Sequence, residues 1–298
     1  MKQDTYERVT ADILSALEKG TVPWRKPWTT AEPISACTRK PYRGANNLLL
    51  SMSPHGSRWW ATYRQIQALG GNVRGGERGT TVIFWKFLDA GGEEDAKRRI
   101  PLLRAFTVFN LDQTDGVDRV KFPEAETRAA TSALDETTAE SIRIAYFGVP
   151  GAPTLEHGGD TASYVPVLDT VRMPNREAFE APAFYWSTLF HEMTHSTGAA
   201  SRLNRRGITD PIQYGSHAYS REELVAEMGA AFLGRESGID GSATLDNSAA
   251  YLQHWADVLR SDTRAVVVAA GQAQKAVDLI RGRSRGEVPE EATEEASA

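Results

Sequence analysis

The sequence predicts an α+β protein with a small N-terminal α+β domain and a mainly helical second domain that contains a short sheet. Its 298 residues correspond to about two domains at the usual size of about 150 residues. Runs of β-forming residues lie mainly before residue 110, whereas apolar residues with helical spacing dominate after residue 180. The expected division is a first domain at 1–115, a linker at 116–138, a second domain at 139–282 and a disordered acidic tail at 283–298.

The N-terminal domain is predicted to begin with a helix and to contain a β-hairpin. Apolar residues recur at steps of three and four through 5–19, and Gly20 ends that helix. A second helical stretch covers 60–69. The segments 80–87 and 104–109 are rich in β-branched and aromatic residues, so we expect two strands joined by a solvated hairpin loop.

The second domain is predicted to contain one strand followed by helices. The strand is expected at 163–173, where β-branched residues are frequent and Pro174 ends the run. The longest helical pattern runs from about residue 183 to residue 197 and stops at Gly198. Further helices are expected at 221–233, 249–259 and 265–280.

The modest net charge of -5 conceals an asymmetry along the chain. Residues 1–110 carry 17 Lys and Arg against 10 Asp and Glu, and the remainder carries 17 against 29. Between Lys19 and Lys86, eleven basic residues face two acidic ones, and five of the seven tryptophans lie in the same segment. Cations that follow phosphates and rings that stack on bases are what a single-stranded nucleic-acid site requires. The alternative is that the tryptophans form the core of a small domain and the charges its solvated face.

Cysteine content and hydropathy exclude several classes of protein. Cys37 is the only cysteine, so the chain has no intrachain disulfide framework and no zinc module built on two or more cysteines. No apolar run approaches the roughly 18 residues of a membrane span, and the N-terminus lacks the apolar stretch of a signal peptide. We therefore expect a cytoplasmic protein with no membrane partner.

A metal-binding pattern lies within the predicted helix at 183–197. His191, Glu192 and His195 form an HExxH motif. Residues four apart share one face of a helix, so both imidazoles can reach one zinc ion. Glu192 lies between the two histidines and can take a proton from a water on the metal. A catalytic zinc needs one further protein ligand beside these two histidines.

The third ligand is expected on the acidic helix that follows. Glu223 and Glu227 are one turn apart and share a face, so we select Glu223 as the ligand and Glu227 as the acceptor for the N–H of a ligand histidine. Glu222 points elsewhere and is expected to be solvated. Tyr219 is a candidate hydroxyl donor to an oxyanion, although a core tyrosine is the simpler interpretation. The alternative for the whole constellation is a metal-free helix pair with buried, hydrogen-bonded polar groups.

With these motifs in order along nearly the whole chain, the sequence resembles the ArdC-type antirestriction proteins of conjugative plasmids. The motifs that carry the resemblance are Gly20–Trp28 (GTVPWRKPW), Tyr42–Asn47 (YRGANN), Thr62–Ile66 (TYRQI) with Gly70 and Gly71, Gly79–Trp85 (GTTVIFW), His191–His195 (HEMTH) and Tyr219–Glu227 (YSREELVAE). Such a long ordered set is far more specific than the HExxH motif taken alone.

The resemblance implies an N-terminal single-stranded DNA-binding domain joined to a zincin-like metallopeptidase domain. It also implies a role in protecting plasmid DNA from host restriction as the DNA enters during conjugation. It supports His191 and His195 as metal ligands, Glu192 as the catalytic residue and Glu223 as the third ligand. The candidate DNA contacts are Trp24, Arg25, Lys26, Trp28, Arg39, Lys40, Arg43, Asn46, Trp59, Arg64 and Arg74.

The cofactor and the partners follow from the same interpretation. Zinc is the expected ion, although two histidines and a glutamate would also accept manganese or cobalt. The expected partners are single-stranded DNA and an unidentified protein substrate. Two other functions fit the same residues: a DNA-targeted regulatory or repair metalloprotease, and a pure single-stranded DNA-binding protein with a structural or vestigial metal site.

Overall fold

The computed structural model describes residues 4–25, 32–90, 98–124, 135–211, 216–239 and 249–283, without the side chains of 25, 85–90, 98–102 and 249. These residues fold into two compact units. The first unit contains 4–9 and 32–124, and the second contains 10–25 and the described residues from 135 onward. The helix α1 (Thr5–Glu18) therefore begins in the first unit and continues into the second. The predicted tail at 283–298 lies outside the described residues beyond Arg283.

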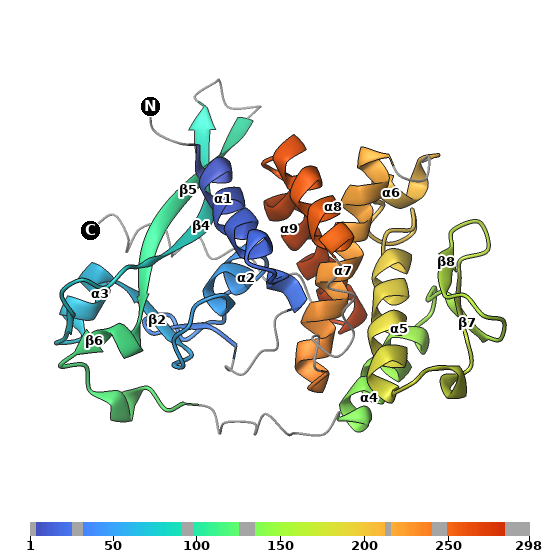
Figure 1. Ribbon diagram of the computed structural model, residues 1–298, viewed down its shortest axis with the longest axis horizontal. Helices are drawn as coiled ribbons and strands as arrows, with labels where there is room; N and C mark the ends of the chain where they lie inside the picture. The colour runs from blue at the N-terminus through green and yellow to red at the C-terminus, as the bar shows by residue number, and fades with distance from the viewer. Residues whose placement is uncertain are drawn as a thin grey trace. The chain divides into compact units, whose positions relative to one another are not determined.

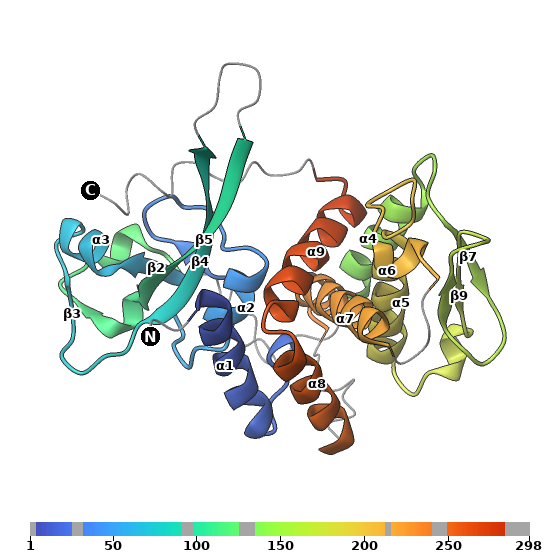
Figure 2. The same cartoon turned by 90° about the horizontal axis from the view of Figure 1, so that it is seen from above.

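The first unit is built on a four-stranded sheet with the order β1-β2-β5-β4. Its strands are β1 (Ile34–Ser35), β2 (Trp59–Thr62), β4 (Thr80–Ala90) and β5 (Arg98–Asn110). A two-stranded sheet pairs β3 (Asn72–Val73) with β6 (Thr114–Asp115). Short helices join them: α2 (Ala45–Ser51), α3 (Tyr63–Ala68), η2 (Leu111–Gln113) and η3 (Arg119–Lys121). The long antiparallel pair of β4 and β5 is seen clearly in Figure 2.

Two apolar clusters form the core of the first unit, and neighbouring tryptophans enter different ones. Trp59 packs with Ile66 and Phe122, whereas Trp60 packs with Leu50 and Val82. Successive side chains of a strand point to opposite faces, which explains why these two rings separate. Phe122 lies beyond the expected boundary at residue 115, so the beginning of the predicted linker at 116–138 contributes to this core.

The second unit is mainly helical and has a three-stranded sheet. Its helices after α1 are η1 (Pro23–Arg25), α4 (Glu136–Phe147), η4 (Arg176–Ala178), α5 (Pro182–Ser196), α6 (Arg206–Thr209), α7 (His217–Ser237), α8 (Ala249–Ser261) and α9 (Ala265–Ile280). The sheet has the order β7-β9-β8, formed by β7 (Thr154–His157), β9 (Thr170–Met173) and β8 (Ser163–Val165). In Figure 1, α7 lies between α5 and α9, and the sheet lies on the far side of α5. The predicted α+β class, with a mainly helical second part, is confirmed.

Local signals in the sequence fix the ends of the two helices that matter most for function. Pro182 occupies the first turn of α5, where its missing N–H costs nothing. The Ser216 side chain accepts a hydrogen bond from the Tyr219 backbone N–H at the start of α7. Gly238 ends α7 in a left-handed conformation, with φ at 68°. Helix α5 therefore begins and ends within one residue of its predicted bounds, whereas α7 begins four residues before and ends four residues after the predicted 221–233.

The N-terminal segment packs within the helical second unit. The Thr10 hydroxyl donates to the Thr263 carbonyl oxygen at 2.7 Å. Trp24 is fully buried, and its ring meets that of Trp255 edge to face with centroids 5.8 Å apart. The beginning of the predicted first domain thus contributes to the core of the unit that carries the HExxH motif.

Two local predictions differ from the structure. The strand expected at 163–173 is an antiparallel pair, β8 and β9, because Pro166 and Asp169 form a tight turn in which Asp169 has a φ of 48°. The helix expected at 60–69 begins only at Tyr63, since residues up to Thr62 belong to β2. Among the described residues, no helix is both long and apolar enough to span a bilayer.

Candidate metal centre

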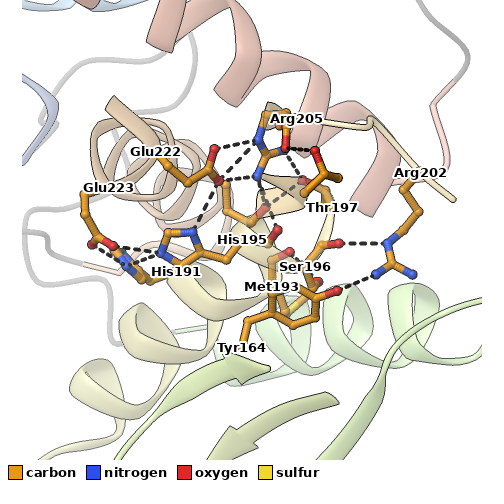
Figure 3. A network of polar contacts seen from close by, with 12 residues as sticks. Tyr164, His191, Met193, His195, Ser196, Thr197, Arg202, Arg205, Glu222 and Glu223 are labelled. Carbon is orange, nitrogen blue, oxygen red and sulfur yellow. Dashed lines mark hydrogen bonds and ion pairs between the residues drawn. The ribbon is translucent and has the colours of Figure 1, made fainter. Parts of the chain in front are cut away.

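Three side chains from α5 and α7 bring nitrogen and oxygen ligand atoms together. His191 and His195 come from α5, and Glu223 comes from the facing helix α7. The two histidine Nε2 atoms lie 3.0 Å apart. The Glu223 carboxylate approaches His191 Nε2 at 3.4 Å and His195 Nε2 at 3.5 Å. Figure 3 shows these three side chains turned toward one another.

The spacing of these atoms fits a single small cation. Nitrogen and oxygen ligands lie about 2.1 Å from zinc, so two ligands at tetrahedral angles lie about 3.4 Å apart. The observed separations of 3.0 to 3.5 Å between Nε2 and carboxylate oxygens match this value. The ligand atoms of the three residues all lie within 4.8 Å of one another. The arrangement offers three ligand atoms, the number that a catalytic zinc site takes from protein beside a water or substrate.

Charges within the cluster shift the pKa values of its members. Burial alone would lower the pKa of His191, but the hydrogen bond with Glu223 and the nearby carboxylates outweigh burial and raise it. Burial alone would raise the pKa of Glu223, but hydrogen bonding to His191 and the charge of the histidines lower it. A negative carboxylate beside two imidazoles is a suitable environment for a divalent cation.

Two further side chains border this cluster. Glu192 is 8% exposed and lies on α5 between the two histidines. Tyr219, one turn before Glu223 on α7, makes a side-chain hydrogen bond to the Glu223 carboxylate. Both residues thus lie beside the ligand atoms, where Glu192 can exchange protons and Tyr219 can orient the carboxylate.

The prediction for Glu222 is wrong, because its side chain is only 5% exposed. Its carboxylate oxygen Oε1 lies 3.3 Å from His195 Nδ1 and 2.6 Å from Arg205 Nη2. Helical spacing does not predict this burial, since Arg205 lies 17 residues before Glu222 and its position depends on the loop after α5.

The predicted role of Glu227 as the acceptor for a histidine N–H does not hold for His195 and stays a prediction for His191. Of the ligand histidines, His195 has its Nδ1 beside Glu222 rather than Glu227. Glu227 is half-buried and contributes through its negative charge, which helps to raise the pKa of His191. Glu222, five residues before Glu227 on α7, is therefore the observed partner of His195 Nδ1, whereas the partner of His191 Nδ1 stays a prediction.

Family models match both parts of the chain. Residues 3–109 match the N-terminal domain of anti-restriction factor ArdC, and residues 147–272 match a zincin-like metallopeptidase. The metal-free crystal structure of the antirestriction protein ArdC from plasmid R388 is 34% identical, with a TM-score of 0.75. The match covers 95% of this chain and all of that one. The chain belongs to the ArdC antirestriction family.

Other relatives extend this family assignment. The Mn(II)-bound crystal structure of the R388 protein is 36% identical over 94% of this chain and 98% of that one, with a TM-score of 0.73. The protein y4eC of Sinorhizobium fredii is 36% identical, over 94% of this chain and 92% of its own length. Two Escherichia coli proteins named DNA primase TraC are each 32% identical, but the chain spans only 29% and 20% of them. The zincin-like match and the Mn(II)-bound relative together indicate a divalent metal for this family.

In this member of the ArdC family, two of the three tryptophans predicted to stack on DNA are buried. Trp24 is 0% exposed and Trp59 is 6% exposed, so neither ring presents a face to a base. The Trp59 indole N–H donates to the Pro123 carbonyl oxygen at 3.0 Å. The stacking prediction is therefore wrong for these two residues. Trp28, Lys26 and the side chain of Arg25 lie outside the described part of the structure.

The predicted polar DNA contacts divide into structural and surface residues. Asn46 is buried, and its amide exchanges two 2.7 Å hydrogen bonds with the backbone of Ile83 on the edge strand β4, so its prediction as a DNA contact is wrong. Arg74 pairs with Glu77 at 2.9 Å. Arg39 lies over the Trp59 ring, 4.8 Å from its centroid. The remaining exposed cations of the predicted set are Lys40, Arg43 and Arg64.

An exposed aromatic residue that was not among the predicted DNA contacts lies beside one of these cations. Tyr63 is 47% exposed and directly precedes Arg64 on α3. Its ring contacts Phe109 of β5 edge to face, with centroids 6.4 Å apart. Tyrosine is common in both cores and surfaces, so only the packing of α3 against the sheet distinguishes Tyr63 from the buried tryptophans.

Proposed function

We propose that this chain binds single-stranded DNA through its first unit and holds a divalent cation in a peptidase site in its second unit. In this proposal it protects plasmid DNA from host restriction as the DNA enters the cytoplasm of a recipient cell. The observation that carries the proposal is the match to the R388 antirestriction protein, which extends over 95% of this chain and all of that one. Two separate units, one with a basic segment and one with the metal-ligand cluster, are consistent with this division of labour.

His191, His195 and Glu223 are the proposed metal ligands. A divalent cation at this position would polarise a peptide carbonyl group and make a water molecule more acidic. Zinc suits two imidazoles and one carboxylate, and manganese is supported by the relative that binds it. Glu192 would accept the proton of the attacking water and pass it to the leaving amine. The Tyr219 hydroxyl would orient the Glu223 carboxylate before reaction and turn its single hydrogen to the developing oxyanion.

The DNA surface is proposed to include Lys40, Arg43 and Arg64, with Tyr63 as a stacking ring. All four side chains are exposed, and Tyr63 and Arg64 are consecutive residues of α3. Cationic side chains neutralise phosphates of any sequence, and a tyrosine ring can stack on any base. Binding should therefore depend strongly on salt and only weakly on sequence.

A salt titration tests the DNA-binding part of the proposal. We expect the Lys40→Ala/Arg43→Ala variant to bind an oligo-dT strand more weakly than the unmodified chain. The slope of log affinity against log salt should fall by about 1.4, because each lost phosphate contact on a single strand contributes about 0.7. Fluorescence anisotropy between low and moderate salt measures both quantities, with duplex DNA as the competitor.

A matched variant controls for the loss of positive charge. Arg206 and Lys275 are exposed cations of the second unit. The Arg206→Ala/Lys275→Ala variant should keep the slope of the unmodified chain. Unchanged affinity and slope in the Lys40→Ala/Arg43→Ala variant would remove these two residues from the DNA surface.

A further inference from the structure

Arg205 and Glu222 form a buried ion pair directly behind one of the proposed metal ligands. Each side chain is only 5% exposed. Arg205 Nε donates to Glu222 Oε2 at 3.0 Å, and Arg205 Nη2 donates to Oε1 at 2.6 Å. This fork geometry fixes the plane of the carboxylate as well as its position. The same Oε1 atom lies 3.3 Å from His195 Nδ1, so the carboxylate lies between the guanidinium and the imidazole, as Figure 3 shows.

The guanidinium of Arg205 is itself held by the end of the HExxH helix. Its Nη1 donates to the Thr197 hydroxyl at 2.7 Å, and its Nη2 donates to the Thr194 carbonyl oxygen at 2.8 Å. Carbonyl groups in the last turn of a helix carry partial negative charge, which favours a cation beside them. Arg205 therefore links the C-terminus of α5 to Glu222 of α7.

Two glycines provide the space in which this pair is packed. A Cβ atom on Gly207 would lie 2.7 Å from Glu222 Oε2 and 2.8 Å from its Cβ. A Cβ atom on Gly198 would lie 3.0 Å from Arg205 Nη2 and 2.5 Å from a side-chain carbon of Ile208. The backbone thus approaches the ion pair closely at Gly207 and at Gly198. The Glu222 carboxylate therefore has little freedom to turn away from His195.

We propose that Arg205 and Glu222 are positioning residues that hold His195 in the tautomer needed for metal binding. A neutral imidazole carries one N–H, and donation of Nδ1–H to Glu222 leaves the lone pair on Nε2. His195 Nε2 is the atom that lies 3.0 Å from His191 Nε2 and 3.5 Å from Glu223. The consecutive residues Glu222 and Glu223 thus have different partners. Glu222 accepts the N–H of His195 Nδ1, and Glu223 binds the cation. The inference rests on the proposed metal site and adds the residues that prepare it.

The experiment separates this role from a structural contribution to stability. Removing one member of a buried ion pair leaves an unpaired charge, whereas replacing both members with apolar residues is often tolerated. We therefore compare Arg205→Met/Glu222→Leu with Arg205→Met/Glu222→Gln, because only glutamine keeps an acceptor for the His195 N–H. The control is Arg221→Gln/Asp262→Asn, which removes a 2.7 Å ion pair that begins one residue away on α7.

Three measurements are made on the full chain: the melting temperature without metal, the His195 tautomer from ¹⁵N chemical shifts of the metal-free protein, and zinc affinity by chelator competition. We expect the leucine double variant to lose the preference for Nδ1–H and to bind zinc about 10- to 100-fold more weakly. The glutamine double variant should recover part of this affinity, and the control should match the unmodified chain.

The unmodified chain alone provides a decisive result even if both double variants fail to fold. If His195 carries its proton on Nε2 in the metal-free protein, the inference is overturned. It is also overturned if the leucine double variant folds, keeps the tautomer and binds zinc within twofold of the unmodified chain. Failure of the unmodified chain to bind a divalent metal would instead contradict the proposed metal site, while the tautomer measurement would still report on Glu222.

Discussion

At the scale of single residues, neighbouring side chains in the candidate metal centre have different tasks because helical geometry separates them. Glu222 and Glu223 are consecutive, and consecutive residues of an α-helix point about 100° apart. The Glu223 carboxylate lies beside the Nε2 atoms of the two histidines, and the Glu222 carboxylate lies beside His195 Nδ1. Glu192 is likewise adjacent to the proposed ligand His191 on α5. Residue type alone therefore does not assign a role in this site.

The Glu192→Gln variant tests the proposed proton acceptor. The amide keeps the shape of the side chain but cannot take a proton, so we expect zinc to remain bound and peptide cleavage to fall about 10²- to 10⁴-fold. Metal analysis and hydrolysis of a quenched fluorescent peptide library provide the two measurements. Cleavage at the unmodified rate by the zinc-loaded variant would contradict the assignment.

The same variant separates the alternative functions. If protection of DNA from a restriction enzyme persists in Glu192→Gln, the antirestriction role depends on DNA occupancy and not on peptidase activity. If protection disappears while DNA affinity is unchanged, the peptidase acts on a protein target.

At the scale of helices, the metal centre depends on the close contact of α5 with α7. A Cβ atom on Gly229 of α7 would lie 2.5 Å from both Oγ1 and Cγ2 of Thr194. Thr194 is fully buried, and its hydroxyl donates to the Phe190 carbonyl oxygen at 2.7 Å. Neither helix can shift away from this contact without moving a proposed metal ligand. Thr194 adjoins His195 on α5, and Gly229 follows Glu223 by six residues on α7.

The Gly229→Ala variant should therefore be destabilised. Overpacking a buried contact costs about 1–3 kcal/mol, which exceeds the gain of up to about 1 kcal/mol from the higher helix propensity of alanine. Chemical unfolding of the metal-free protein measures the change. Gly271→Ala is the matched control on α9, since nothing lies within 4 Å of its Cβ position. Equal stability of the two variants would show that α5 and α7 can separate without cost.

At the scale of the whole molecule, the order of segments along the chain differs from their grouping in space. Residues 10–25 precede the basic unit in sequence but pack into the helical unit that carries the proposed metal ligands. Trp24 meets Trp255, and Glu18 pairs with Arg260 at 3.2 Å. The basic and aromatic residues of 19–86 are thus divided between two units, and the three tryptophans of this segment whose side chains are described, Trp24, Trp59 and Trp60, are buried.

Replacing Trp24 distinguishes a core role from a DNA-binding role. We expect Trp24→Ala to lower the free energy of unfolding of the helical unit by about 3–5 kcal/mol, as for other buried tryptophans. Affinity of the folded protein for single-stranded DNA should not change. Tyr63→Ala should behave in the opposite way, with weaker DNA binding and little loss of stability. A loss of DNA affinity in Trp24→Ala without loss of stability would restore this ring to the DNA surface.

Much of the fold could be predicted from the sequence because it is encoded locally. The apolar periodicity and the terminators of α1, α5, α7 and α9 lie within each segment, as do the β-forming runs of β4 and β5. The turn at 166–169 and the start of α3 differ from the prediction. Both adjoin strands of three or four residues, which are too short to show a clear alternation of apolar and polar residues.

The sequence by itself determined the fold class, the HExxH helix and the acidic helix that faces it. Fixed helical spacing is a local property, so His191 and His195 had to share a face wherever the helix packed. Only the tertiary structure decided which glutamate serves which atom, and which aromatic rings remain exposed. Those outcomes depend on contacts between distant segments, such as Arg205 with Glu222 and Trp24 with Trp255. Whether a side chain is buried depends on which distant segment packs over it, and the residue type alone does not identify that segment.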